Sequence, residues 1–554
     1  MRTYNDRMFI DTFEHEYTWL NAFLRNVSRF PEKKALTDPE TCRSWTYAGL
    51  NEEANRLANA LQALGLKKND VVMVAMRNCP EFAFSYIAPR KIGAVMFAAN
   101  YNLASGELAL LINCNKPKAV LYSADIASKM KEAENLADWK AASFILADNL
   151  EKTEIPENHI SYEDFVAASG RENPIPDFRP HIYDEVLRLC TSGTSSLVKL
   201  VPVNDINEVL SAHDVIMQYP MNFSDTTLNM TPWFHRGGVH SGGLCPSFYC
   251  GACVVIMRRF QPANTLDWVE KYNITFLMGV PSNLALLLKV QKRSPRKLDT
   301  LKGLVTMGSP LSKDVCISCM KVLTPHIFNG YGTTETFWNS FLRPYNLPEM
   351  AGSAGISCLD DDVRLVKIYE NKRAEPDELV ASDGKTEGEI IIRSPGKTTY
   401  AYINNEELAE GRFYKGWMYT GDTGSWDKDL FVTIKGRKDD MIVCGGENIY
   451  PQQIEEILNA HPKVKDSIVT GLPDVLRGQA VAAYVVPEDK SLTISELFEF
   501  CTNNKMLSNY KRPRYFAIID ELPQTATGKK KHAEIKKRAL KDLEDGILKH
   551  GSGE

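Results

Sequence analysis

The chain has 554 residues, 44% of them hydrophobic and 24% charged, and its formal net charge is -5. This length predicts about three to four domains around a large buried core. A mildly acidic chain has no general attraction to nucleic acid or to anionic membranes, so neither is an expected partner. The N-terminus carries charges where a signal peptide needs an apolar core, which predicts a cytoplasmic protein with no integral membrane segment.

In chain order, the first half alternates between helix and strand patterns. Residues 47–66 have apolar side chains at helical spacing. Continuous apolar runs, typical of strands buried on both faces, occur at residues 70–76, 117–123, 142–148 and 185–193. The alternation continues through 274–290 and 303–311. It predicts layered α/β structure, with ligands beyond the carboxyl ends of the strands.

The twelve cysteines are scattered, which favours a reducing compartment. Cys316 and Cys319 form one C-x-x-C pair, but no second pair completes a zinc site. We expect both to be buried thiols on a helix.

The pattern changes near residue 385 to short strands with Gly/Asp turns, which predicts a small β-rich subdomain. After Asp440 come a helix at 450–462, a strand at 480–488, and a helix that Thr493 caps. The predicted fold is therefore a large α/β N-terminal domain of layered subdomains with the β-rich subdomain, residues 1–438. A small mobile α+β C-terminal domain, residues 439–554, follows it.

The stretch "LRLCTSGTSSLVKLVPVN", residues 187–204, has the composition of a phosphate-binding loop but not the Walker pattern. A strand runs into a cluster of hydroxyl and glycine residues, and Lys199 supplies a cation for phosphates. The hydroxyls and backbone donors belong to Thr191, Ser192, Gly193, Thr194, Ser195 and Ser196.

Five further stretches stand out, and their order is the informative feature. They are "PWFHRGG" (232–238), "NGYGTTE" (329–335), "YTGD" (419–422), "GRKDDMIVCGGENIYPQQIEE" (436–456) and "LPQTATGKKK" (522–531). Together with the loop they resemble the adenylate-forming superfamily of acyl- and aryl-CoA synthetases, nonribosomal adenylation domains and luciferases. The resemblance is closest to AMP-forming acyl-CoA synthetases and covers nearly the whole chain.

The resemblance implies roles for an ATP site. Thr334 would bond the AMP phosphate, Glu335 would bind Mg²⁺, and Tyr331 would stack on adenine. Asp422, with Arg437 beside it, would accept hydrogen bonds from the ribose hydroxyls. The remaining nucleotide-binding positions are Gly308, Ser309, Pro310, Asn329, Gly332 and Thr333.

The C-terminal motifs imply a two-step reaction. Lys529 would stabilise the adenylation transition state, and Asp439 is the hinge about which the C-terminal domain rotates before a thiol displaces AMP. Contacts to CoA would come from Gly445, Gly446, Arg477, Tyr510, Arg512 and Arg514.

The phosphate loop departs from the family pattern T-S-G-T-T-G-x-P-K-G. Ser196, Val198 and Leu200 replace a glycine, a proline and a glycine. Glycine alone visits positive φ at low cost, so we expect a phosphate loop with altered mobility.

The acid pocket is predicted among "PWFHRGGVHSGG" (232–243), "VPSN" (280–283), "MGSPL" (307–311) and "TTETFWNS" (333–340). His235 matches a catalytic residue that gates the pocket. Acetate-specific relatives carry an indole where Gly332 stands, so the acid should be larger than acetate: medium-chain, alicyclic or aryl. The predicted lining residues are Trp233, Phe234, Gly237, Gly238 and Trp338.

The resemblance implies an AMP-forming carboxylic acid–CoA ligase that uses ATP, Mg²⁺ and free CoA. Two alternatives stay open: acyl transfer to a separate carrier protein, and a ligand-binding pseudoenzyme. A homodimer is also left open.

Overall fold

A computed structural model describes residues 5–103, 105–191, 199–369, 372–440, 442–444, 447–449, 451–474, 478–504, 507, 509–525 and 529–551. The chain divides into two compact units. Unit 1 comprises Met1–Val363 and Ile392–Met418, and unit 2 comprises Arg364–Ile391 and Tyr419–Glu554. The predicted domain boundary between residues 438 and 439 falls inside unit 2 and stays a prediction.

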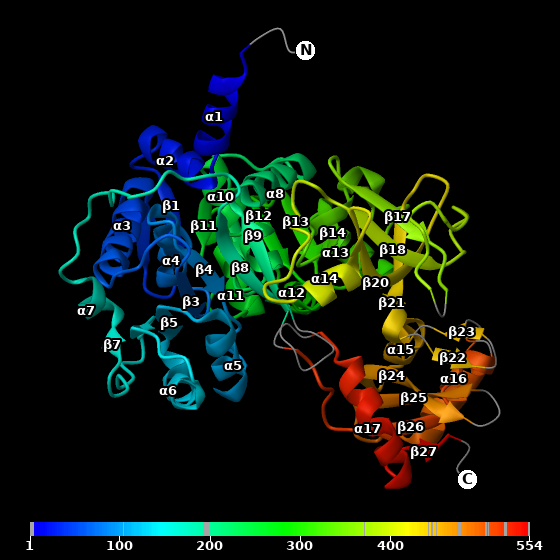
Figure 1. The fold of residues 1–554 in the computed structure, drawn as a ribbon. Coiled ribbons are helices and arrows are strands. Elements are labelled where there is room, and N and C mark those ends of the chain that lie inside the picture. The colour runs from blue at the N-terminus through cyan, green and yellow to red at the C-terminus, as the bar shows by residue number, and fades with distance from the viewer. Residues whose placement is uncertain are drawn as a thin grey trace. The chain divides into compact units, whose positions relative to one another are not determined.

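One sheet of unit 1 is buried on both faces (Figure 1). Its described strands, in spatial order, are β7 (Ile160–Ser161), β6 (Ser143–Ala147), β5 (Ala119–Ser123), β3 (Val71–Ala75), β4 (Val95–Ala98), β8 (Glu185–Thr191) and β9 (Lys199–Asn204). The strands are parallel except for the β8–β9 pair. Val72 and Val74 pack with the helices of one face, and Met73 with those of the other. This alternation explains the continuous apolar runs in the sequence.

Helices cover both faces of that sheet. The face with Val72 carries α3 (Tyr47–Ala63), α4 (Pro80–Lys91) and α7 (Tyr162–Val166), and the face with Met73 carries α5 (Ser105–Asn115) and α6 (Ala127–Leu136). The start of α3 is set by a side-chain cap, since the Thr46 hydroxyl accepts a hydrogen bond from the Gly49 amide at 3.1 Å.

The second sheet of unit 1 positions most of the predicted nucleotide-binding motifs. Its described strands, in spatial order, are β16 (Ile356–Ser357), β15 (Phe337–Leu342), β14 (Ile327–Thr333), β13 (Gly303–Met307), β12 (Phe276–Gly279), β10 (Thr226–Asn229), β11 (Cys253–Val255), β1 (Lys34–Asp38) and β2 (Arg43–Thr46). The helices that accompany it along the chain are α2 (Trp19–Arg29), α8 (Asp205–Gln218), α9 (Arg236–His240), α10 (Leu244–Cys250), α11 (Pro262–Lys271), α12 (Pro281–Arg293) and α13 (Lys313–Val322). Cys316 and Cys319 are buried on α13, as predicted.

A third sheet forms the β-rich part. Its described strands are β17 (Asp362–Val366), β18 (Gly388–Arg393), β20 (Trp417–Trp426), β19 (Phe413–Tyr414) and β21 (Val432–Arg437), with α14 (Glu406–Arg412) before β19. It begins at Asp362, earlier than the predicted change near residue 385, because β17 joins the sheet before a long intervening loop.

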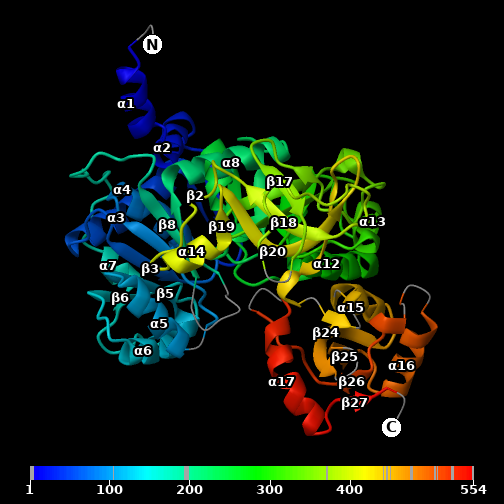
Figure 2. The ribbon, with the colours of Figure 1, turned by 45° about the vertical axis from the view of Figure 1, so that its right-hand side comes forward.

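The last sheet belongs to unit 2 and has helices on both faces (Figure 2). Its described strands are β23 (Glu447–Ile449), β22 (Ile442–Cys444), β25 (Gly478–Pro487), β26 (Tyr515–Ile518), β27 (Lys549–His550) and β24 (Val464–Asp474). One face packs against α15 (Pro451–Asn459) and α16 (Ile494–Asn503), the other against α17 (His532–Glu544). Thr493 caps α16 as predicted, and Glu496 completes a capping box.

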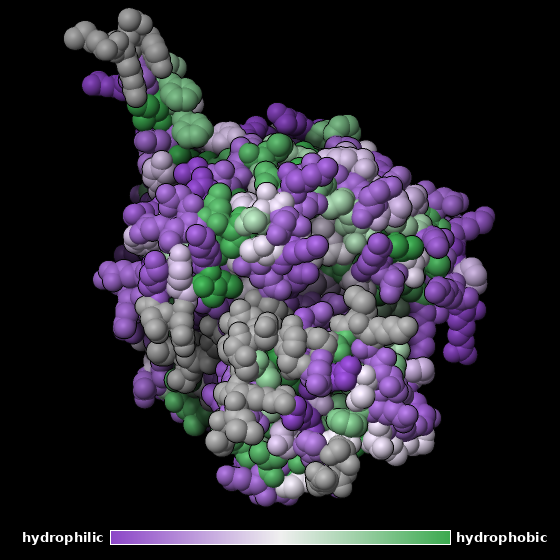
Figure 3. Space-filling model, turned by 90° about the vertical axis from the view of Figure 1, so that its right-hand side faces the viewer, coloured by the Kyte–Doolittle hydropathy of each residue, from purple (hydrophilic) through white to green (hydrophobic). Residues whose placement is uncertain are grey.

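The N-terminal helix α1 (Arg7–Glu16) differs from the other long helices because none of its residues is buried. Met8 is 81% exposed and Phe9 is 67% exposed. Hydrophobic side chains form a green group toward the top of the surface view (Figure 3). Elsewhere on the face shown, polar residues predominate.

Lys91, the last residue of α4, is a buried cation with neutral partners. Its ammonium donates to Asn51 Oδ1 at 2.8 Å and to Asn173 Oδ1 at 3.0 Å, and no described carboxylate forms an ion pair with it. Burial lowers the pKa of Lys91 from 10.5 to about 7. The folded state therefore disfavours the proton that the unfolded chain still binds at neutral pH.

We predict that Lys91 makes the protein more stable as pH rises. Its folded pKa lies below its unfolded pKa, so the cost is largest below about pH 7 and fades toward the unfolded value. Between about pH 7 and about pH 9 the free energy of unfolding should rise by about 2 kcal/mol. Thermal melting across this range should show the slope in the wild type and a reduced slope in Lys91→Met. The exposed Lys67→Met is the control, and equal slopes in all three proteins would contradict the assignment.

Candidate active site

Residues 333–335, the T-T-E end of the "NGYGTTE" stretch, lie at the turn between β14 and β15 in unit 1. Thr336 N donates to Thr333 Oγ1 at 3.2 Å, and the Thr333 and Thr336 hydroxyls are 2.9 Å apart. The Thr336 hydroxyl also donates to Asn339 at 2.6 Å. The turn that presents Thr334 and Glu335 is thus closed by its own side chains.

Arg236, beside His235 in "PWFHRGG", lies on α9 and holds this turn. Its guanidinium donates to the carbonyl oxygens of Thr334 at 2.6 Å and Glu335 at 3.3 Å, and to that of Lys397 at 3.0 Å. Burial lowers the pKa of Arg236 to about 10, which leaves it cationic at neutral pH. A buried cation with carbonyl partners holds backbone in place, because losing any of these bonds would leave charge unsatisfied.

Lys397 ties the same region to α8. Its ammonium lies 2.8 Å from Asp214 and 2.7 Å from Asp361, and it donates to the Trp338 carbonyl at 2.5 Å. Burial acts to lower the pKa of Lys397, but the two carboxylates raise it, so it stays charged. This ion-pair group and Arg236 meet at the Lys397 backbone.

Among the described residues, Tyr402 is the hydrogen-bond partner of the Glu335 carboxylate. The Tyr402 hydroxyl donates to Glu335 Oε1 at 2.6 Å, and both residues are buried. Burial and the neighbouring carboxylate raise the pKa of Tyr402, so its hydroxyl stays a donor. Mg²⁺ prefers one or two carboxylates together with substrate phosphate oxygens, so this donor set fits the ion.

The predicted adenine-binding residues lie at one edge of the second sheet. β13 and β14 are parallel, with Met307 opposite Gly330, so 308–310 and 331–334 follow at the same strand ends. Asn329, a predicted nucleotide-binding residue, is buried. Its side-chain amide donates to the Ser353 carbonyl at 3.1 Å. A Cβ at Gly332 would lie 1.5 Å from the Phe337 carbonyl oxygen, so the hairpin itself requires this glycine, independently of pocket size.

His235 stands at the N-cap of α9. Its Nε2 atom is buried with no hydrogen-bond partner among the described residues, and its ring lies 4.2 Å from that of Phe234. Burial lowers the pKa of His235 to about 4, so the imidazole is neutral at physiological pH.

The predicted acid-pocket aromatics divide between two apolar clusters. Trp233 packs on Phe82 at 5.7 Å, and with Phe234 it belongs to the core around α3 and α4. Trp338 lies in a separate cluster, which we call the Trp338 cluster. It contains Val215, Tyr219, Met221, Phe276, Met278, Val305, Met307, Phe328, Phe337, Trp338, Phe341 and Cys358.

Of the two predicted pocket glycines, Gly237 borders the Trp338 cluster. A Cβ at Gly237 would lie 3.5 Å from the Met307 side chain. A Cβ at Gly238 would lie 1.9 Å from the Pro232 carbonyl oxygen, so Gly238 is required by the backbone.

The phosphate loop connects β8 to β9, where Thr191 pairs with Lys199. Ser192, Gly193, Thr194, Ser195, Ser196 and Val198 lie outside the described residues. Leu200 does not belong to the loop, contrary to the expectation from the sequence. Leu200 lies inside β9 and pairs with Cys190 of β8. Its side chain is buried in the core beside α5 and α6. A leucine here fills that core, which a glycine would not.

The remaining predicted residues belong to unit 2. Asp422 pairs with Arg437 across β20 and β21. Lys529 is exposed, and its amide donates to Thr525 Oγ1 at 3.1 Å. Arg512 donates from Nε to the Leu507 carbonyl at 3.2 Å.

Some predicted CoA and hinge positions are described only in part. The Arg514 amide donates to the Val481 carbonyl at 2.8 Å. Gly445, Gly446 and Arg477 lie outside the described residues, as do the side chains of Tyr510, Arg437 and Asp439.

Two family models match the chain: AMP-binding enzyme over residues 23–402, and AMP-binding enzyme C-terminal domain over residues 453–529. The chain therefore belongs to the AMP-binding enzyme family. The predicted membership of the adenylate-forming superfamily is confirmed.

Individual relatives agree with this assignment. The chain is 30% identical to an indoleacetate–CoA ligase of Aromatoleum aromaticum over 92% of this chain and 96% of that protein. It is 27% identical to a 4-chlorobenzoate–CoA ligase of Arthrobacter over 93% of each chain. The o-succinylbenzoate CoA synthetase of Bacillus subtilis with its acyl-adenylate matches at 25% identity and a TM-score of 0.80, covering 93% of this chain and 98% of that one. The predicted α/β fold and the enzyme class of acid–thiol ligases are confirmed.

Among the described residues, the helices are too short or too polar to cross a bilayer.

Sequence reasoning missed Arg236, Lys397 and Tyr402. Arg236 lay inside the quoted motif "PWFHRGG", but a charged residue there reads as exposed until its carbonyl partners are known. Tyr402 is 67 positions from Glu335 along the chain, so only the fold brings the two together.

We predict that Tyr402→Phe weakens Mg²⁺-dependent ATP binding about tenfold, because outer partners of metal ligands typically contribute that much. Calorimetric titration of ATP with and without Mg²⁺ measures the effect independently of turnover. Tyr400→Phe, two positions away, is the control. Equal ATP affinity of both variants at every Mg²⁺ concentration would show that Tyr402 does not support the ion.

Proposed function

We propose that the protein is an AMP-forming carboxylic acid–CoA ligase for an aryl or alicyclic acid. The observation that carries the proposal is the Thr334–Glu335 turn, held by Arg236 and Tyr402 at the carboxyl ends of β13 and β14. This turn places a hydroxyl and a carboxylate where a nucleotide phosphate with its ion would bind. ATP and CoA are cytoplasmic cosubstrates, so we propose the cytoplasm as the place of reaction and leave the homodimer as an expectation.

In the first half-reaction, a carboxylate oxygen attacks the α-phosphorus of ATP, and pyrophosphate leaves. Thr334 donates to the α-phosphate, and Lys529 neutralises the charge that develops on the attacked oxygens. Asp422 accepts hydrogen bonds from the ribose hydroxyls. Glu335 would hold Mg²⁺, which when bound would supply positive charge beside the phosphates.

In the second half-reaction, the CoA sulfur attacks the acyl carbon, and AMP leaves with the bonding electron pair. Rotation about Asp439 withdraws Lys529 and admits the thiol. The imidazole of His235, the proposed gate of the acid pocket, is neutral at physiological pH, so it presents no charge to the bound acyl group. Arg512 and Arg514 suit the phosphates of free CoA, which favours CoA over a carrier protein.

We infer the acid class from the Trp338 cluster. Tyr219 and Trp338 rings lie 6.2 Å apart, and Phe341 lies 4.7 Å from Trp338. The Tyr219 hydroxyl and the Trp338 Nε1 atom are buried with no hydrogen-bond partner among the described residues. Buried donors in native proteins are normally satisfied, so the acid should offer an acceptor on its ring as well as an apolar body.

We predict that Lys529→Ala lowers the rate of acid-dependent pyrophosphate release at least about a hundredfold, as the loss of a transition-state contact does. Thioester formation from supplied acyl-AMP should stay near the wild-type rate. The neighbouring exposed lysine in Lys531→Ala is the control. Equal loss in both half-reactions would refute the role of Lys529. If the wild type releases no pyrophosphate with any acid, the protein is the ligand-binding pseudoenzyme. If the thioester forms only on a carrier protein, the acyl acceptor is that protein and not CoA.

We also predict that acids with a ring acceptor are preferred by the wild type about tenfold over matched acids without one, because each unpaired buried donor is costly. A panel of aryl, alicyclic and medium-chain acids, scored by kcat/KM for CoA-dependent AMP formation, measures this preference. Tyr219→Phe should lower it while leaving the rate with unsubstituted acids unchanged. An unchanged preference in Tyr219→Phe would show that this hydroxyl does not bind the acid.

A further inference from the structure

Two short segments of unit 2, residues 523–525 and 529–531, pair with each other, and we call this pair, which carries Lys529, the Lys529 hairpin. The Thr525 amide donates to the Lys529 carbonyl at 2.8 Å, and the Lys531 amide donates to the Pro523 carbonyl at 2.9 Å. Gln524 and Lys530 form an antiparallel bridge between these bonds. The hairpin fixes the backbone of Lys529 but leaves its long side chain exposed.

Lys530 anchors the hairpin to the body of unit 2. Its ammonium lies 2.8 Å from Asp466 Oδ1 and 3.2 Å from Glu455 Oε2, and it donates to the Ser467 carbonyl at 2.6 Å. Glu455 lies on α15, and the other two belong to β24. The residue next to Lys529 is therefore held by two elements of the rigid core.

Glu455 joins this anchor to the start of α17. Its side chain is 5% exposed, and it accepts a hydrogen bond from the Val469 amide at 2.8 Å. The same oxygen lies 2.6 Å from Nε2 of His532, the first residue of α17. Glu455 thus connects Lys530, inside the hairpin, with His532, the residue directly after it.

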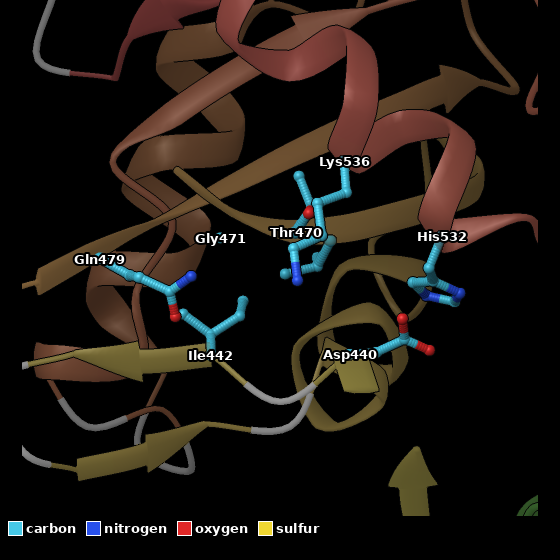
Figure 4. A pocket seen from close by; sticks show the side chains of 8 residues that line it. Asp440, Ile442, Thr470, Gly471, Gln479, His532 and Lys536 are labelled. Carbon is cyan, nitrogen blue, oxygen red and sulfur yellow. The ribbon is translucent and has the colours of Figure 1, made fainter. Parts of the chain in front are cut away.

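His532 also faces the segment that carries the predicted hinge. Figure 4 shows its imidazole beside the Asp440 carboxylate, at one end of the pocket. Asp440 ends the 3₁₀ helix Lys438–Asp440, directly after the predicted hinge residue Asp439. Lys438 in turn lies 3.1 Å from Glu389 on β18. His532 therefore lies between an anchored helix and the hinge.

The charges around His532 favour its protonated form. Burial acts to lower the pKa of His532, but the hydrogen bond and charge of Glu455 and the charge of Asp440 raise it above 6.5, against a smaller opposing effect of Lys530. Lys536, on the next turn of α17, lines the same pocket. An imidazolium between two carboxylates bonds to both, whereas a neutral ring donates to only one.

We propose that His532 is a positioning residue for adenylation, whose imidazolium bridges Glu455 and Asp440 and so holds the Lys529 hairpin in fixed register with the hinge helix. The inference rests on the proposed ligase function. Lys529 must reach atoms that react within a narrow geometry, and a displacement of about 1 Å in such groups costs about a hundredfold in rate. Because Lys529 acts only in the first half-reaction, the effect of His532 should be confined to that step.

His532→Gln and Glu455→Gln test the proposal, since both keep side-chain size and remove charge. We expect about a tenfold or greater loss in pyrophosphate release with acid and ATP, with KM for ATP little changed and thioester formation from acyl-AMP retained. His461→Gln is the matched control, because His461 packs on Phe500 at 4.8 Å elsewhere in unit 2. Equal losses in both half-reactions, with a matching fall in melting temperature, would reduce His532 to a stabilising residue and overturn the proposal.

The pH profile gives a signature that a merely structural role would not produce. The pKa of His532 is raised on folding, so its contribution is complete below about pH 6.5 and disappears as pH rises through the folded value. The ratio of wild-type to His532→Gln adenylation rates should therefore fall toward one as pH rises. A ratio that is constant with pH contradicts the role of the imidazolium.

A measurement without substrates separates this inference from the proposed function. Hydrogen exchange at the amides of Thr525, Lys529 and Lys531 should be faster in His532→Gln than in the wild type and in His461→Gln, while exchange in the strands β24 and β25 stays unchanged. If these amides exchange equally in all three proteins, the bridge does not hold the hairpin. A wild type that exchanges as expected but releases no pyrophosphate with any acid would instead refute the ligase function alone.

Discussion

The hydrogen bonds from the buried guanidinium of Arg236 to the backbone of Thr334, Glu335 and Lys397 are the interaction on which the site in unit 1 depends. A turn that connects two strands is often mobile, yet the binding of phosphate and an ion needs groups held in fixed positions. A buried cation solves this because its carbonyl partners cannot be exchanged for water. Tyr402 then needs to orient only one carboxylate, since the backbone beneath Glu335 is already held.

The features that depend on residues close together in the sequence were predictable. Apolar runs located β3, β5, β6 and β8, and the capping pattern located the start of α16, because these signals depend on neighbours in sequence. The motifs located the T-T-E turn, which the structure places at the strand ends where ligands gather. Family membership followed from the order of the motifs and is confirmed by the matches to residues 23–402 and 453–529.

The features set by contacts distant in sequence were not predictable. The sequence singled out neither Lys397 nor Lys91. Only the fold shows that Lys397 has two carboxylate partners and that Lys91 has none among the described residues. The sequence assigns Leu200 to the loop because it stands at the last glycine of the family pattern, whereas its pairing with Cys190 places it in a strand. Trp233 and Trp338 read as one pocket, but the structure assigns them to different apolar clusters.

The two networks have a property that suits an enzyme with two half-reactions. Among the described residues, the hydrogen bonds of Arg236, Lys397 and Tyr402 join residues of unit 1, and the contact between Glu455 and His532 lies within unit 2. Each network is thus complete without a residue of the other unit. Asp440, Glu455 and His532 all follow the proposed hinge residue Asp439 in the chain, so the proposed rotation would move these three residues together and would break no hydrogen bond of either network.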